Sequence, residues 1–147
     1  MTTEESGMKR RSFLKLIGAA GLGGMAGAVM GPATASAAPM TVGTRAFGRT
    51  GIQVPLLSLG TMFDTGANQL LLRQAVKWGV TYWDTAQYYN RWGSEPGLGK
   101  YLARYPEDRK KIFLVSKSTQ RDPAGLTAEL NDSLNNLKTD YLDLFFI

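Results

Sequence analysis

The chain has 147 residues, of which 44% are apolar, 20% charged and 10% aromatic, a composition typical of one globular domain rather than a disordered or fibrous chain. It contains neither cysteine nor histidine, which excludes disulfides and thiolate metal sites and leaves carboxylate, lysine and tyrosine for any catalysis. The formal net charge is +5, but a net two of these charges lie in the first fifteen residues, and the run Arg109–Lys111 explains most of the rest. We interpret that run as a solvated turn and expect no nucleic-acid partner and no metal.

The first forty residues are typical of a targeting segment. KRRSFLK at 9–15 supplies a basic region with paired arginines, residues 16–29 are a short apolar run rich in glycine and alanine, and ATASAAP at 33–39 is a small-residue cleavage region. This order predicts a twin-arginine signal peptide over residues 1–38, cleaved near Ala37 or Ala38. We therefore expect export by the Tat machinery to the periplasm or the extracellular space, with only transient membrane contact. The alternative is an uncleaved membrane anchor, although the apolar run is shorter than the roughly 20 residues a span needs.

A β-hairpin is predicted next, between residues 44 and 54. Gly48 and Gly51 in FGRTG supply the backbone freedom for a turn between two short extended pieces. Such a hairpin would precede the first strand of the fold, where it could plug one end of a barrel. The alternative is a loose linker behind the signal.

Four short apolar runs follow, and each of the last three comes after a segment with helical periodicity. The runs are LLSLG at 56–60, VTYWD at 80–84, IFLVS at 112–116 and LDLFFI at 142–147. Their starts lie about 24 to 32 residues apart, which is the spacing of βα units. The runs are therefore predicted to be parallel strands.

Three helices are predicted between these runs, each from one apolar face and from signals at its ends. The first ends before Gly79, which suits a left-handed terminal residue. Ser94 is expected to cap the second helix, and Asp122 followed by Pro123 to begin the third. The apolar faces comprise Leu71, Leu72, Ala75 and Val76 in the first helix, Leu98 and Leu102 in the second, and Leu126, Leu130, Leu134 and Leu137 in the third.

Parallel strands joined by helices bury both faces and read as continuous apolar runs. Such units build either an open doubly wound sheet or a closed eight-stranded barrel. The residues after the first run, TMFDTG at 61–66, lack the G-x-G-x-x-G turn of a Rossmann domain. We therefore predict an α/β fold, a (β/α)8 TIM barrel, of which residues 44–147 form an N-terminal half of about four βα units preceded by a hairpin.

A barrel of this kind places its chemistry at the C-terminal ends of its strands. Gly60 and Thr61 end the first run, Asp84 ends the second, and Lys117 follows the third. The pair Tyr88–Tyr89 lies in the loop after the second run. Polar residues from several strand ends are thus expected to meet at one rim.

These residues resemble the aldo-keto reductases. The resemblance rests on GIQVPLLSLGT at 51–61, DTAQYY at 84–89, GSE at 93–95 with LG at 98–99, the lysine at 117, and YLDLFFI at 141–147. In that family a tyrosine, a lysine, an aspartate and a histidine surround a carbonyl that is reduced by a nicotinamide cofactor, usually NADPH. The resemblance implies an NAD(P)H-dependent oxidoreductase that converts an aldehyde or ketone, a small-molecule carbonyl substrate, to an alcohol.

The residue types also fit this chemistry. Hydride attack on a carbonyl carbon leaves an oxyanion that needs a proton and a hydrogen bond. Tyrosine, with an ordinary pKa of about 10, is a reluctant acid near neutrality unless an ammonium group lies close to it. Lys117 can supply that ammonium, and Asp84 would keep it charged. The family's spacing of five residues from aspartate to tyrosine implies Tyr89 as the acid, with Tyr88 as the alternative.

The resemblance further implies that Gly60, Thr61 and Met62, with Asp84, bind the cofactor at the nicotinamide side of the pocket. One departure from the family lies beside the tyrosine, where Asn90–Trp92 replace a common glycine. The substrate pocket is therefore expected to have a different shape.

Two features bear on activity. The family histidine, expected directly after the run at 142–147, has no counterpart in the chain, and a full barrel needs about 250 residues. We therefore expect a truncated half barrel that is inactive alone. The alternatives are a non-catalytic binding module with the same fold and an inert remnant.

Overall fold

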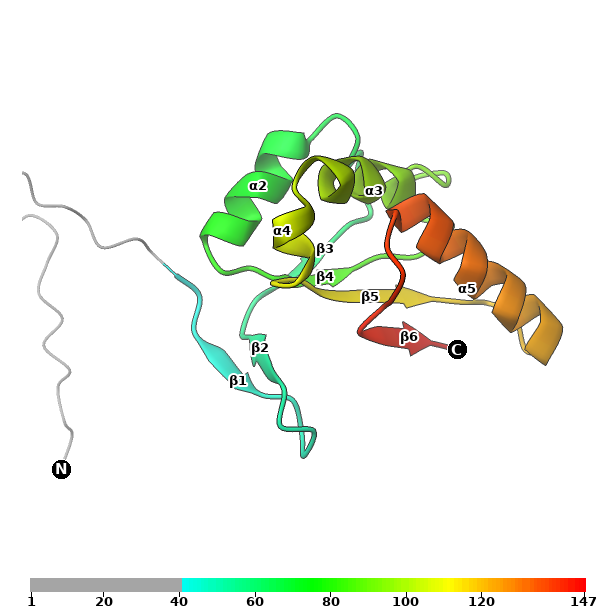
Figure 1. The fold of residues 1–147 in the computed structure, drawn as a ribbon, viewed down its shortest axis with the longest axis horizontal. Coiled ribbons are helices and arrows are strands. Elements are labelled where there is room, and N and C mark those ends of the chain that lie inside the picture. Colours follow the sequence, from blue (N-terminus) through cyan, green and yellow to red (C-terminus); the bar gives the residue numbers. More distant parts are fainter. Residues whose placement is uncertain (1–40) are drawn as a thin grey trace, which may run out of the picture. The chain divides into compact units, whose positions relative to one another are not determined.

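The computed structural model describes residues 41–147, which fold around a four-stranded parallel sheet. The predicted signal peptide at 1–38 lies outside the described residues. The strands are ordered as in the chain, β3-β4-β5-β6, and helices connect them. Figure 1 shows the helices on one side of the sheet and the hairpin toward the other. This arrangement confirms the predicted α/β fold of successive βα units.

The strands are short and fall within or at the edge of the predicted runs. They are β3 Ser58–Gly60, β4 Tyr82–Asp84, β5 Phe113–Lys117 and β6 Leu144–Phe146. Lys117 is the last residue of β5 rather than the residue after it. All three pairings are parallel, with Gly60 opposite Asp84 and Lys117 opposite Phe146. The C-terminal ends of all four strands therefore meet at one edge of the sheet.

In the described part of the chain, four helices connect the strands. They are α2 Gln69–Lys77, α3 Ser94–Arg104, α4 Pro106–Arg109 and α5 Pro123–Leu137. Asp122 caps α5 as predicted, because its Oδ1 accepts a hydrogen bond of 2.9 Å from the Gly125 amide. Gly79 after α2 has the predicted left-handed conformation, with φ at 75°. Within residues 41–147 no helix is both long enough and apolar enough to cross a membrane.

The main core lies between the sheet and helices α2, α3 and α5. Its buried members are Leu72, Ala75, Val80, Trp83, Leu98, Tyr101, Leu102, Ile112, Leu114 and Leu137. Trp83 of β4 and Leu114 of β5 are register partners and are completely buried. Each large side chain of this kind stabilises the fold by roughly 1.5–3 kcal/mol. Because side chains alternate along a strand, the residues that follow Trp83 and Leu114 face the opposite side of the sheet.

Two details of the helices differ from the sequence prediction. Leu71 is 43% exposed, so the inner face of α2 is formed by Leu72 and Ala75 instead. Gly93 rather than Ser94 occupies the N-cap of α3, and no side chain caps that helix. Ser94 is instead completely buried, because its hydroxyl turns toward the strand ends.

The prediction of a solvated turn at 109–111 is also wrong in part. Lys110 and Lys111 are exposed, but Arg109 retains only 7% of its accessible surface. Its guanidinium contacts the start of β5 and the segment before β6, including an ion pair of 3.0 Å from Nη2 to Asp143 Oδ2. A long cation with five donors can satisfy several backbone acceptors while buried.

The predicted hairpin is present. β1 Thr44–Ala46 pairs antiparallel with β2 Gln53–Pro55, and Gly48 and Gly51 in the connecting loop have φ of 57° and 78°. Phe47 meets Phe113 of β5 edge-on at a ring-centre distance of 5.5 Å. The hairpin therefore covers part of the sheet face that the helices leave open.

Candidate active site

Strand register brings two of the predicted catalytic side chains to one face. Asp84 is paired with Val115, and in parallel strands paired residues project to the same side. Lys117 lies two residues after Val115 on β5 and therefore shares that side. This is the face opposite Trp83 and Leu114, away from the helices.

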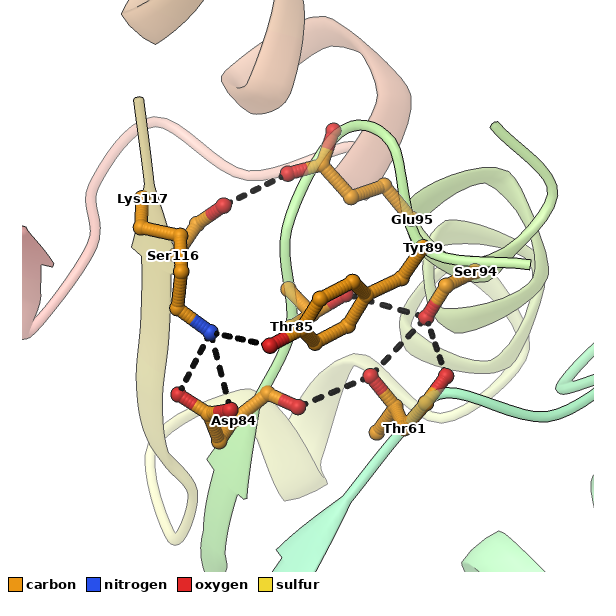
Figure 2. Close-up of polar contacts among 8 residues, drawn as sticks. All are labelled: Thr61, Asp84, Thr85, Tyr89, Ser94, Glu95, Ser116 and Lys117. Atoms are coloured by element: carbon orange, nitrogen blue, oxygen red, sulfur yellow. Dashed lines mark hydrogen bonds and ion pairs between the residues drawn. The ribbon is translucent and has the colours of Figure 1, made fainter. Parts of the chain in front are cut away.

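The three predicted catalytic residues meet around one nitrogen atom (Figure 2). Lys117 Nζ donates hydrogen bonds of 3.1 and 2.9 Å to Asp84 Oδ1 and Oδ2, and one of 2.8 Å to Tyr89 Oη. The nitrogen also lies 4.4 Å from the centre of the Tyr89 ring. All three ammonium hydrogens are thus directed to these two partners.

The cluster is partly open to solvent, and its hydrogen bonds and charges affect the pKa of Lys117. The side chains of Lys117 and Asp84 keep 20% and 31% of their accessible surface. Burial alone would lower the pKa of Lys117, but the hydrogen bonds to Tyr89 and Asp84 and the charge of Asp84 raise it above its ordinary value of 10.5. Lys117 is therefore a permanent cation at neutral pH.

Among the tyrosines near this cluster, Tyr89 is the one whose hydroxyl reaches the lysine. Tyr88 is 45% exposed and packs edge-on against the Tyr89 ring at 5.2 Å. Tyr82 lies two residues before Asp84 on the same strand face; burial, followed by the charge of Asp84, raises its pKa. Tyr82 is therefore poorly suited to release a proton.

The loop that carries Tyr89 has an unusual backbone. Asn90, Arg91 and Trp92 follow it with φ of 49°, 52° and 63°, the left-handed region that is unfavourable for L-residues. The Gly93 amide closes this turn on the Asn90 carbonyl at 2.9 Å, and the Ser94 amide bonds to the Tyr89 carbonyl at 3.2 Å. The turn brings the start of α3 back beside Tyr89.

The residues expected at the nicotinamide side differ in their exposure and in their hydrogen bonds. Gly60, opposite Asp84, has open space where a Cβ would stand, and Met62 is 73% exposed. Thr61 is fully buried, and both its amide and its hydroxyl donate to the Asp84 carbonyl, at 3.0 and 2.8 Å. Gly60 therefore leaves open space at the end of β3, while Thr61 holds the adjacent end of β4.

Sequence reasoning missed a layer of polar residues behind the cluster. Ser94, Thr85, Glu95 and Ser116 are all completely buried and are joined by hydrogen bonds to one another or to Thr61. The available signal was the acid in the GSE segment, which stands in the first turn of a helix with an otherwise apolar inner face.

Comparison with known proteins agrees with this geometry. The family model described as "Aldo/keto reductase family" matches residues 39–147. The chain belongs to the aldo/keto reductase family. The solved structure of aldo-keto reductase AKR11C1 from Bacillus halodurans has a TM-score of 0.61 and 28% identity to it, and the match covers 71% of this chain and 39% of that one. The sheet and helices described above are thus those of an aldo-keto reductase TIM barrel.

Curated relatives agree with the family assignment. Aldo-keto reductase family 4 member C11 of Arabidopsis thaliana is 34% identical over 105 residues, which is 67% of this chain and 32% of the relative. NADPH-dependent codeinone reductase 1-3 of Papaver somniferum is 33% identical over 109 residues, covering 67% and 33%. The chain spans about a third of the length of these curated relatives.

Proposed function

We propose that this aldo/keto reductase carries the proton-donating residues of an NADPH-dependent carbonyl reductase, with Tyr89 as the acid, Lys117 as its electrostatic partner and Asp84 as the partner of the lysine. The observation that supports this most strongly is the single ammonium group of Lys117, bonded at once to the phenol and to both carboxylate oxygens. A purely structural ion pair has no need of the phenol.

The hydrogen-bond directions suit proton donation. Lys117 donates to Tyr89 Oη, so the phenol hydrogen itself remains available for a carbonyl oxygen of the substrate. As that proton leaves, the adjacent ammonium stabilises the developing phenolate. Asp84 accepts the other two ammonium hydrogens and keeps the lysine protonated and correctly oriented.

The cofactor proposal concerns the nicotinamide end alone. A bound NADPH would supply the hydride that adds to the carbonyl carbon, while the proton from Tyr89 completes the alcohol. Gly60 would let the ring approach the sheet edge, Met62 would cover one side of the ring, and Asp84 lies opposite Gly60 on the neighbouring strand. NADPH is favoured over NADH because codeinone reductase, a relative, is named for it. The proposed substrate is a small aldehyde or ketone.

The test is a paired tyrosine substitution. Activity is measured in a whole aldo-keto reductase that contains this segment, because the segment alone is expected to be inactive. In that protein, NADPH oxidation with an aldehyde should fall by about 10²–10⁴ in Tyr89→Phe, the usual contribution of a positioned acid. Tyr88→Phe, which alters the exposed neighbour, should retain nearly full activity. Cofactor fluorescence should report NADPH binding in both variants. Equal activity in the two variants would refute the assignment, and no NADPH binding in any form would favour a non-catalytic module or an inert remnant.

We also propose that residues 1–38 direct export through the Tat machinery to the periplasm or beyond. The support is the order of basic, apolar and small-residue regions around Arg10 and Arg11. Replacing both arginines by lysine should leave the protein in the cytoplasmic fraction after cell fractionation. Unchanged export of that variant would contradict the proposal.

A further inference from the structure

The first two residues of α3, Ser94 and Glu95, lie behind the candidate site and are called here the anchor pair. Both are completely buried, and Figure 2 shows Glu95 bonded to Ser116 and Ser94 bonded to Thr61 and Thr85. Neither residue touches the groups that would react. Each one is instead bonded to a residue next to one that does.

Ser94 fixes the end of β4. Its hydroxyl donates to the Thr61 carbonyl at 2.8 Å and lies 3.0 Å from the Thr85 hydroxyl. Thr61 in turn donates twice to the Asp84 carbonyl. The peptide unit that follows Asp84 is therefore held by Thr61, and the Ser94 hydroxyl contacts both Thr61 and Thr85.

Glu95 fixes the end of β5. Its Oε1 accepts a hydrogen bond of 2.7 Å from Ser116 Oγ, and its Oε2 accepts one of 3.2 Å from Asn136 Nδ2 of α5. Ser116 immediately precedes Lys117, and its side chain points to the opposite face of β5. Holding Ser116 from behind therefore sets the direction in which the Lys117 side chain leaves the strand.

The anchor pair also reaches Tyr89 through the backbone. The Ser94 amide donates to the Tyr89 carbonyl at 3.2 Å across the left-handed turn at 90–92. All three candidate catalytic residues thus have a neighbour or a backbone group bonded to the same two residues. The distances among the three residues therefore depend on the position of the start of α3.

Stability alone does not account for this arrangement. Glu95 is a fully buried carboxyl group whose partners are a neutral hydroxyl and a neutral amide, and within residues 41–147 no cation forms an ion pair with it. Burying such a group is costly, and well-packed apolar residues often fill the same space at least as favourably. We therefore look to the position of Glu95, rather than to stability, for the role of this carboxyl group.

We propose that Ser94 and Glu95 are positioning residues that set the distances among Asp84, Tyr89 and Lys117 from behind the sheet. The inference rests on the proposed function for its catalytic meaning, but the positions of the three residues can be measured without any turnover.

The test follows the Lys117 ammonium by its NMR titration, in protein labelled with ¹³C-lysine and assigned with Lys117→Arg. Ser116→Ala removes the hydroxyl of the tether but keeps the Glu95 side chain. The lysine should then lose part of its contact with Asp84 and Tyr89, and its titration midpoint should fall by about one pH unit. Ser116→Thr, which restores a hydroxyl, should return the midpoint to the wild-type value.

Two further variants make the result decisive. Asp108→Asn alters a buried carboxyl group that accepts a hydrogen bond of 2.7 Å from Tyr101, far from the site along α3 and α4. It should destabilise the fold without moving the Lys117 midpoint. Thr85→Val, a substitution of nearly unchanged shape, tests the Ser94 side if Ser116→Ala does not fold, and it should lower the midpoint by a smaller amount.

The outcomes separate the two proposals. An unchanged Lys117 midpoint in both Ser116→Ala and Thr85→Val, or an equal fall in Asp108→Asn, would overturn the positioning role even in an active enzyme. A lowered midpoint with rescue by Ser116→Thr supports it even where no carbonyl reduction is found. Where reduction is found, Ser116→Ala should lower kcat by about tenfold or more with little change in KM, because misplaced catalytic groups chiefly slow the chemical step.

Discussion

Two ion pairs at opposite ends of β5 show how differently the same sheet can use a cation. Before the strand, Arg109 binds Asp143 Oδ2 at 3.0 Å and also donates to the Ile112 and Tyr141 carbonyls and the Thr139 hydroxyl. At its C-terminal end, Lys117 divides its three ammonium hydrogens between a carboxylate and a phenol.

The two ion pairs differ in whether a hydrogen remains available for donation. The Arg109 pair is closed, because every partner is a structural acceptor and Asp143 Oδ2 also accepts from the Leu114 amide at 2.8 Å. The Lys117 pair ends on a hydroxyl that still carries a proton to donate. Arginine suits the first use because its planar fork satisfies several fixed acceptors, and lysine suits the second because it is a compact charge. We infer that one pair holds the fold and the other serves chemistry.

The largest expected effect is the loss of activity in Lys117→Met. Removing the ammonium leaves Tyr89 without its electrostatic partner, and carbonyl reduction should fall by about 10²–10⁴. The free energy of unfolding should change by less than about 1 kcal/mol, since the pair is partly exposed. Steady-state NADPH oxidation and urea unfolding measure the two quantities. A large loss of stability with unchanged turnover would contradict the inference that the Lys117 pair serves chemistry rather than the fold.

Arg109→Met should have the opposite profile. The substitution removes the charged donor that Asp143 and two carbonyl groups share, and the free energy of unfolding should fall by about 3 kcal/mol. Under conditions where the variant is folded, its turnover should match the wild type. Urea unfolding with activity measured below the transition checks both parts. The interpretation of Arg109 as structural fails if the midpoint of unfolding does not move.

A smaller effect is expected from pH. The folded-state pKa of Lys117 is raised, so the stability it contributes is fully present below its ordinary value of 10.5 and is lost as pH rises through the higher folded-state value. The difference in unfolding free energy between the wild type and Lys117→Met should therefore be constant from neutral pH to about pH 10 and then shrink. Arg109 stays charged throughout this range, so Arg109→Met should show no such change. Unfolding measured in a series of alkaline buffers tests this contrast.

The smallest effect concerns left-handed residues near each pair. Arg91, after Tyr89, has φ of 52°, and Lys138, which ends α5 beside Thr139, has φ of 54°. Glycine at either position should stabilise the fold by about 0.5–1 kcal/mol, because it accepts this conformation without strain. Thermal unfolding should show both gains. Only Arg91→Gly should lower turnover, since it loosens the turn that holds Tyr89; equal activity in both variants would show that this turn has no part in placing the phenol.

Much of the fold was predictable because its signals are local. The apolar runs at 80–84 and 112–116 became β4 and β5 within one or two residues, and Asp122 with Pro123 began α5 as expected. The errors at Leu71 and Arg109 arise from tertiary packing: which side of a helix meets the sheet, and which cation finds buried acceptors, depend on neighbours far away in the chain.

The candidate site was also predictable only in part. Asp84, Tyr89 and Lys117 could be named from the sequence, since a parallel sheet gathers its strand ends at one edge and the family motif supplies the spacing. The buried layer of Ser94, Glu95 and Ser116 could not, because serine and glutamate in a first helical turn are common for capping alone. Only the close approach of α3 to the strand ends gives them another role.

The amino-acid sequence by itself determined the βα repeat, the family and the identity of the polar residues at the strand ends, because periodicity and short motifs are written along the chain. The tertiary structure alone decided how closely Tyr89 approaches the lysine, that Arg109 is buried, and that Ser94 and Glu95 contact the strand ends behind the site. Those contacts join residues that are mostly 20 to 40 positions apart, and their geometry depends on how helices pack on a sheet rather than on any local preference.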